Sequence, residues 1–132
     1  MRCDTQAGVH GVFFAWPVYC SLEESMHRYG SVIRLRPEME ARYRELHAAV
    51  WPEVLAQISA SNIRNYTIFL RDGVLFSYFE YVGEDFAGDM ARMAQDPTTQ
   101  QWWQLTDPCQ ERLPETPDGE QWAPMEEVFH VD

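Results

Sequence analysis

Three side chains suited to acid–base chemistry and to ring stacking recur at four-residue intervals near the middle of the chain. Tyr43, His47 and Trp51 are predicted to share one stripe of a helix, because residues four apart are neighbours on a helix surface. Histidine gives and takes protons near neutral pH, tyrosine offers a directional hydroxyl, and indole is a flat apolar surface. The pattern suits a ring-lined site for a small molecule. Ordinary packing of this stripe against a sheet is the alternative that the spacing leaves open.

Further aromatic residues extend the possible site. Trp102 and Trp103 are adjacent, so on a helix their side chains diverge by about 100° and at most one can face a core squarely. Such a pair suits the apolar face of a sugar, or it wedges a short helix in place. Tyr66 lies in the middle of a predicted strand, where core packing is the ordinary expectation. The sequence contains no GxSxG or GxGxxG motif and no matched cysteine–histidine spacing.

Composition excludes several classes of function. The chain has 132 residues and a formal net charge of −11, so nucleic acid and anionic membranes are poor partners. All ten basic residues are arginine, which excludes Schiff-base chemistry and a lysine-containing phosphate loop. The three cysteines form no CxxC motif, and the four histidines show no metal-binding spacing. We therefore expect neither a metal nor a disulfide framework, and a cytoplasmic location.

The length favours one compact domain, which we place at residues 26–132. Residues 1–25 differ from the rest and are predicted to be a peripheral N-terminal extension, with Met26 as a possible true start. The apolar run at residues 11–20 is interrupted by Pro17 and is too short to span a bilayer. It also lacks the charged region and cleavage site of a secretory signal.

The remaining sequence predicts a definite order of elements. Residues 29–35 form a strand, and two helices follow at 37–49 and 52–60, separated because Pro52 cannot continue a helix. Strands at 64–70 and 74–81 flank an Asp-Gly turn. A helix then begins near Phe86, the Asp-Pro pairs at 96–97 and 107–108 each cap and open a short helix, and residues 127–131 form a final strand.

The resulting order, β-α-β-β-α-β, is that of the ferredoxin-like arrangement in the α+β class. It predicts a four-stranded antiparallel sheet with helices on one face. The opposite face would be broad and apolar, and such a surface is normally covered. We therefore expect a homodimer.

Taken together, these motifs resemble the L-rhamnose mutarotases, a family of small dimeric α+β barrel enzymes. The matching segments span about four-fifths of the chain: YRELH at 43–47, VWPE at 50–53, NY at 65–66, QWW at 101–103 and EEVF at 126–129. The resemblance implies interconversion of the α and β anomers of L-rhamnose without metal or cofactor. It also implies a site with His47 as proton donor, supported by Trp51, in which the substrate-binding residues are Tyr43, Tyr66, Trp102 and Trp103. The base is not identified, and residues 1–25 lie outside the resemblance.

Two other interpretations remain open at this point. Cofactor-free monooxygenases of the same fold also line a barrel with tryptophan, tyrosine and histidine. A non-catalytic sugar-binding dimer, in which the aromatic residues only pack or bind, is the second alternative.

Overall fold

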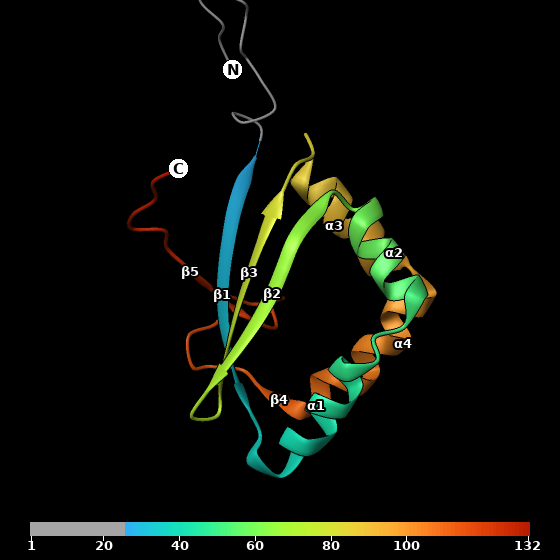
Figure 1. The fold of residues 1–132 in the computed structure, drawn as a ribbon, viewed down its shortest axis with the longest axis vertical. Helices are drawn as coiled ribbons and strands as arrows, with labels where there is room; N and C mark the ends of the chain where they lie inside the picture. The colour runs from blue at the N-terminus through green and yellow to red at the C-terminus, as the bar shows by residue number, and fades with distance from the viewer. Residues whose placement is uncertain (1–25) are drawn as a thin grey trace, which may run out of the picture.

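The computed structural model describes residues 26–132, so the expected extension at residues 1–25 lies outside the described residues. Within that range the chain forms an antiparallel sheet with a layer of helices on one side (Figure 1). Its elements are β1 (His27–Leu35), α1 (Glu40–Ala48), α2 (Pro52–Ala60), β2 (Ile63–Arg71), β3 (Val74–Tyr81), α3 (Phe86–Gln95), α4 (Pro97–Thr106), β4 (Gln110–Glu111) and β5 (Ala123–Met125).

The strand order confirms the predicted ferredoxin-like α+β class. The sheet runs β2-β3-β1-β4 with antiparallel neighbours, so the two central strands are β1 and β3. The connection from β1 to β2 contains α1 and α2, and the connection from β3 to β4 contains α3 and α4. Both connections cross the same face of the sheet, and the other face carries no helix (Figure 1).

The helices begin where the sequence predicts. Pro37 opens a short 3₁₀ turn before α1, and Pro52 occupies the first turn of α2, where its missing N–H has no partner to lose. Asp96 caps α4, because its carboxylate accepts a hydrogen bond from the Thr99 backbone N–H at 2.9 Å. The prediction that Asp107 caps a helix is wrong. Asp107 is the first residue of a 3₁₀ turn, Asp107–Cys109, and its side chain makes no capping bond.

The hairpin between β2 and β3 has the predicted turn. Asp72 and Gly73 take φ values of 50° and 73°, the left-handed conformation that a two-residue hairpin turn requires. Glycine adopts this conformation freely, and aspartate tolerates it. The turn fixes the register in which Leu70 faces Leu75.

The core lies between the helices and the inner face of the sheet. Apolar side chains from β1 and β3 meet residues from α1, α2 and α4 there, because alternate residues of a strand point to the same face. The buried cluster consists of Ile33, Leu35, Tyr43, Leu46, Val54, Leu75, Trp102 and Cys109. This core holds α1 and α4 against the sheet.

The edge of the sheet beside β1 is made of two short pieces. β4 pairs with Arg34 and Leu35, and β5 pairs with residues 30–32 of the same strand. A loop at residues 112–122 leaves the sheet between them. Pro124 is tolerated in β5 because that strand is at the edge, where a missing N–H breaks no ladder.

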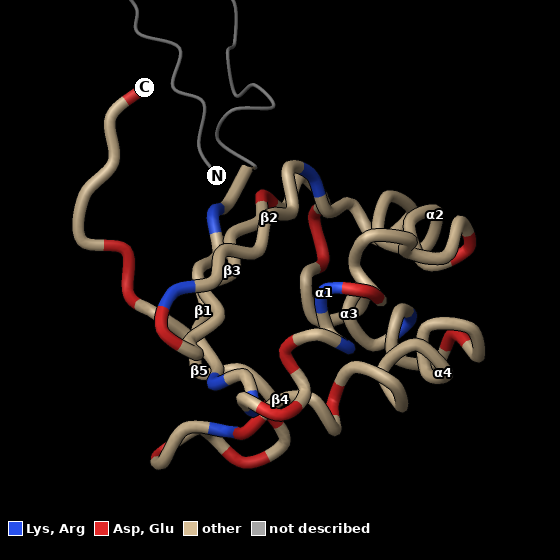
Figure 2. The backbone as a smooth tube through the Cα atoms, turned by 60° about the horizontal axis from the view of Figure 1, so that its bottom comes forward, with Lys and Arg blue, Asp and Glu red and all other residues tan. Residues whose placement is uncertain are grey.

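The predicted final strand at residues 127–131 is wrong. Residues 126–132 form no strand and lie on the side of the sheet away from the helices (Figure 2). Val128, Phe129 and Val131 are 90%, 79% and 72% exposed. The alternation of apolar residues is real, but the segment forms no ladder with β1, which pairs instead with β5 at residues 30–32. An ion pair between Arg28 and Glu127 at 2.7 Å ties its beginning to β1.

No helix within residues 26–132 is long and apolar enough to cross a membrane.

Candidate active site

A cavity of about 990 Å³ lies between the sheet and the helix layer, with an opening to solvent. Its volume is typical of a small-molecule site. It brings together all five of the catalytic and substrate-binding residues predicted from the sequence, which are Tyr43, His47, Tyr66, Trp102 and Trp103. The remaining wall comes from apolar residues of α2, from α3, and from the loop at residues 112–122.

His47 is held in a defined orientation at the C-terminal end of α1. Its Nδ1 lies 2.9 Å from the backbone carbonyl oxygen of Tyr43, one turn earlier on the helix. Because a carbonyl oxygen only accepts, Nδ1 carries the hydrogen, and Nε2 is the nitrogen that can exchange a proton. The rings of Tyr43 and His47 are 4.1 Å apart between centroids. The half-buried imidazole therefore presents one reactive nitrogen beside a phenol.

Trp102 and Trp103 differ in burial, as expected for adjacent residues of a helix, whose side chains diverge. Trp102 is 6% exposed and meets the His47 ring edge-on, with centroids 5.5 Å apart. Trp103 is only half-buried and lines the cavity. Trp102 is thus a fixed wall behind the histidine, whereas Trp103 has more of its indole free for a ligand.

Trp51 supports the site from outside it. Its ring packs edge-on against Trp102, with centroids 5.3 Å apart, and it does not line the cavity. The prediction that Trp51 shares a helix stripe with Tyr43 and His47 is wrong, because α1 ends at Ala48 and Trp51 precedes Pro52 as the N-cap of α2. It reaches the site through Trp102.

A β-bulge aims Tyr66 into the cavity. Arg64 pairs with Glu80 and Thr67 pairs with Tyr78, so Asn65 and Tyr66 together oppose the single residue Phe79. Asn65 takes a φ of 52°, which asparagine accepts more readily than most residues. The extra residue shifts the inward–outward alternation by one. Tyr66 consequently faces the helices, and it is 43% exposed because it borders the open cavity.

Both cavity tyrosines are suited to donating hydrogen bonds. Burial raises the pKa of Tyr43 well above its usual value of 10; the hydrogen bond from Gln110 lowers it by a smaller amount, and nearby negative charge, including that of Asp107, raises it further. Desolvation also raises the pKa of Tyr66. The two hydroxyls therefore stay protonated through the neutral and mildly alkaline range.

Sequence reasoning missed a pair of glutamines that orients Tyr43. Gln110, buried on β4, donates from Nε2 to the Tyr43 hydroxyl oxygen at 3.3 Å. Its own Oε1 accepts from Gln121 Nε2 at 3.4 Å. The Tyr43 oxygen accepts this bond, and no acceptor among the described residues takes the hydroxyl hydrogen, which is therefore available to a ligand. No spacing rule links these residues, because a loop brings Gln121 back to the cavity.

The same loop is held by one arginine. Arg112 donates from Nε to the Glu120 carbonyl at 2.8 Å and from Nη2 to the carbonyls of Thr116 and Pro117. This set of bonds fixes the backbone from which Glu120, Gln121 and Trp122 reach the cavity wall. The loop is therefore an ordered part of the site.

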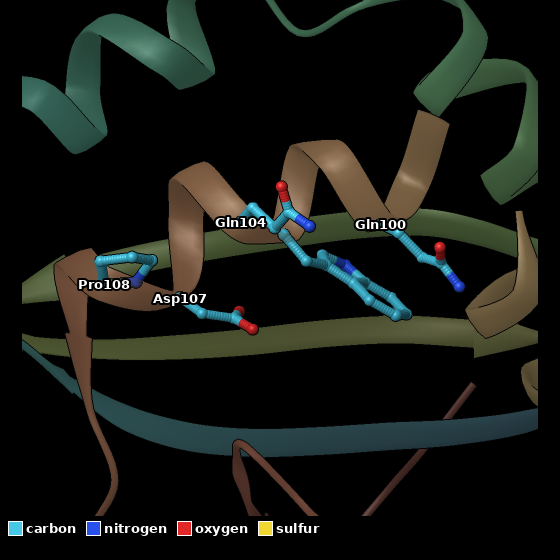
Figure 3. Close-up of a pocket in the computed structure, with 5 residues that line it drawn as sticks. Gln100, Gln104, Asp107 and Pro108 are labelled. Carbon is cyan, nitrogen blue, oxygen red and sulfur yellow. The ribbon is translucent and has the colours of Figure 1, made fainter. Parts of the chain in front are cut away.

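Asp107 was assigned a capping role from the sequence, but it lies at the site. It lines the cavity and also a shallower pocket of about 540 Å³ on the outside of α4, shared with Trp103 (Figure 3). Desolvation raises the pKa of the Asp107 carboxyl above its ordinary value of 3.8. A carboxylate just after the last turn of a helix before proline was the signal available in the sequence. Among residues 26–132, no three metal-ligating side chains lie close enough together to hold a metal ion.

These features define a class of protein: a ferredoxin-like α+β fold whose cavity combines one oriented imidazole, phenol hydroxyls and indoles. The chain belongs to the L-rhamnose mutarotase family, whose family model matches residues 28–131.

Individual relatives agree with this assignment. The chain is 31% identical over 109 residues to an L-rhamnose mutarotase from Bacteroides thetaiotaomicron, an alignment that covers 81% of this chain and 100% of the relative. It is 29% identical over 109 residues to an L-rhamnose mutarotase from Oceanobacillus iheyensis, with the same two coverages. The family resemblance inferred from the motifs is confirmed.

Solved structures confirm the fold. An L-rhamnose mutarotase from Formosa agariphila matches with a TM-score of 0.62 at 23% identity, covering 80% of this chain and 99% of that one. Tetracenomycin F2 cyclase, a type II polyketide cyclase from Streptomyces glaucescens, also matches with a TM-score of 0.62, at 10% identity, covering 80% of this chain and 97% of that one. The second match shows that this fold serves more than one chemistry.

Proposed function

We propose that the protein interconverts the α and β anomers of L-rhamnose, with His47 as the proton donor. The observation that carries this proposal is the imidazole on the cavity wall, whose Nδ1 is bonded to the Tyr43 carbonyl and whose Nε2 is left to react. Membership of the L-rhamnose mutarotase family supplies the sugar.

The reaction needs one acid and one base. A base removes the proton of the anomeric hydroxyl while the C1–O5 bond breaks, and Nε2 of the His47 imidazolium protonates the ring oxygen. The products are an aldehyde and a free C5 hydroxyl. Rotation about the C1–C2 bond and reversal of the proton transfers close the ring with the opposite configuration. Positioned acid–base groups accelerate such steps by about 10²- to 10⁴-fold.

The other cavity residues bind and orient the sugar. Tyr43 and Tyr66 donate hydrogen bonds to sugar oxygens from hydroxyls that stay protonated because their pKa values are raised. Trp103 stacks on the C–H face of the ring, while Trp102 keeps the histidine in place. Contact with the 6-methyl group distinguishes a deoxysugar by only about 1–3 kcal/mol, so we expect related sugars to react more slowly.

Saturation-transfer NMR of the anomeric protons of L-rhamnose tests the function directly. The wild-type protein should transfer saturation between the α and β signals, and His47→Ala should return the exchange rate to the spontaneous value. His47→Gln is the matched variant that retains volume and a donor but cannot shuttle a proton. Wild-type exchange rates in both variants would refute the role of His47. Oxygen uptake with an aromatic substrate, in place of anomer exchange, would favour the monooxygenase alternative.

We further propose that the protein acts as a homodimer joined through the helix-free face of the sheet. Phe69, Phe76 and Val32 are neighbours across that face, and Phe69 is 62% exposed. The C-terminal segment 126–132 adds exposed apolar side chains on the same side (Figure 1). A second copy would cover both surfaces, since a patch of this kind is rarely left in water. Light scattering should give twice the chain mass for the wild type and the chain mass for Phe69→Glu.

The cysteine content supports a cytoplasmic location. Cys109 is buried as a free thiol, which suits a reducing compartment.

A further inference from the structure

The proposed reaction needs a base, and the structure offers five groups on the cavity wall that could accept a proton. His47 is committed to the acid role, and Tyr43 and Tyr66 are protonated because desolvation raises the pKa of both. The other two are the carboxylates of Asp107 and Glu120. We propose that Asp107 is the general base that removes the proton of the anomeric hydroxyl.

The position of Asp107 supports this choice. It follows the last residue of α4, five residues after Trp102, which contacts the His47 ring. Asp107 and His47 line the same cavity, whose volume of about 990 Å³ is ample for one pyranose ring, and the Asp107 charge lies close enough to the Tyr43 hydroxyl to raise its pKa. Figure 3 shows the Asp107 side chain projecting from the end of this helix.

The Asp107 carboxylate is also free to react. The other aspartates of the helical connection are engaged: Asp85 and Asp96 cap helices, and Asp89 bonds to Tyr81 and Asn62. In the part of the chain that the structure describes, no hydrogen bond or ion pair holds the side chain of Asp107, and desolvation alone accounts for its raised pKa. Partial removal from water makes a carboxylate a stronger base.

The local structure gives no other reason for an acidic residue here. Asp107 makes no capping bond to the following 3₁₀ turn. It is the C-cap of α4, at the negative end of the helix dipole, where a carboxylate is unfavourable. Asp107 is exposed to solvent and lines the cavity, so its carboxylate can reach a ligand there although its charge is unfavourable at this position and makes no local bond, as expected of a group placed for its chemistry.

Each proton can then be followed through the reaction. Asp107 takes the proton from O1 as the C1–O5 bond breaks, and the electron pair of that bond is protonated at O5 by His47. After rotation about C1–C2, His47 Nε2 takes the proton back from the C5 hydroxyl as O5 attacks the other face of C1. The protonated Asp107 returns its proton to O1. Both side chains end in their initial states.

Asp107→Asn tests the assignment, which rests on the proposed function. Anomer exchange should fall by about 10²- to 10⁴-fold, while the Kd for L-rhamnose, measured by calorimetry, stays within about threefold of wild type. Formate should partly restore exchange to Asp107→Ala, because a small carboxylate can occupy the vacated volume. The variants should be at least as stable as wild type, since an unfavourable charge is removed from the end of α4.

Two control variants complete the experiment. Asp72→Asn removes the same charge from a side chain that is 88% exposed at the hairpin turn, and it should exchange at the wild-type rate. Wild-type exchange rates in Asp107→Asn would overturn the assignment. If Glu120→Gln lost exchange activity in that case, Glu120 would be the base instead. A wild-type protein that left the exchange rate at its spontaneous value would instead refute the proposed function itself.

Discussion

The bulge that aims Tyr66 depends on the backbone conformation of Asn65, and substitutions there separate strain from lost bonding. Asn65 has a φ of 52° and donates to Glu80 Oε1 at 2.8 Å in an exposed position. Alanine in the left-handed region costs about 1–2 kcal/mol, and the lost hydrogen bond adds about 0.5–1.5 kcal/mol. Glycine loses the hydrogen bond but is not strained. We therefore expect Asn65→Ala to be less stable than Asn65→Gly by about 1–2 kcal/mol.

The same pair of variants tests the link to the site. If Asn65→Ala relieves the strain by losing the bulge, the alternation of β2 reverts and Tyr66 turns away from the cavity. The KM for L-rhamnose should then rise in the alanine variant and stay near wild type in the glycine variant. Urea denaturation gives the stability difference, and saturation-transfer NMR at several sugar concentrations gives KM. Equal stability and equal KM in the two variants would refute the argument that Asn65 determines the direction of Tyr66.

Two further predictions concern buried polar groups. Gln110→Glu should raise the KM for L-rhamnose about tenfold, because a carboxylate would accept the Tyr43 hydroxyl hydrogen that the sugar needs and a lost buried hydrogen bond costs about 1–3 kcal/mol. Gln110→Met, which also removes the bond to Tyr43, should raise KM by a similar factor. An unchanged KM in both variants would contradict the role given to Gln110. Asp89 has a pKa lowered to about 2, chiefly by its hydrogen bond from Tyr81 and then by those from Asn62 and Arg92. Because this pKa is lower in the folded state, ionised Asp89 stabilises the fold at pH values above its unfolded pKa of 3.8, and this stabilisation is lost as the pH falls toward 2. The free energy of unfolding, measured with urea, should therefore drop between about pH 4 and pH 2 in the wild type. It should drop less in Asp89→Asn. An identical pH dependence in the two proteins would contradict the stabilising role of Asp89.

Much of the fold could be predicted because local signals determine it. Pro37, Pro52 and the Asp96–Pro97 pair mark helix starts by backbone chemistry alone. The Asp72–Gly73 turn needs positive φ at both positions, which few other pairs supply. Each of these features depends only on neighbouring residues, and the structure contains all of them.

The edge of the sheet could not be predicted because it depends on competition between distant segments. Residues 127–131 have the alternation of a strand, but β5 pairs with β1 at residues 30–32 instead. β4 is only two residues long, and its pairing gives no periodic signal. The pairing of this edge depends on which segment lies beside β1 after the loop at residues 112–122, and β-propensity alone does not encode that tertiary context.

In the candidate site, too, some residues could be predicted from local spacing and others could not. His47 and Tyr43 could be paired by their spacing, since both lie on one helix. The direction of Tyr66 depends on a bulge, which adds one residue to the count between inward and outward positions. The contribution of Gln121 depends on a loop returning to the cavity, and that of Asp107 on α4 ending one residue before it. These contacts are set by tertiary structure and leave no pattern in the chain.

The division of the edge strand into β4 and β5 has a consequence for how sugar preference could diversify. The segment between them supplies Arg112, Glu120, Gln121 and Trp122 to the rim of the cavity, yet both of its ends are anchored on β1. Insertions or deletions there would reshape the entrance while His47 and the rest of the cavity wall kept their places. A graft of this one segment between homologues is thus a natural unit for engineering acceptance of bulkier or more polar monosaccharides.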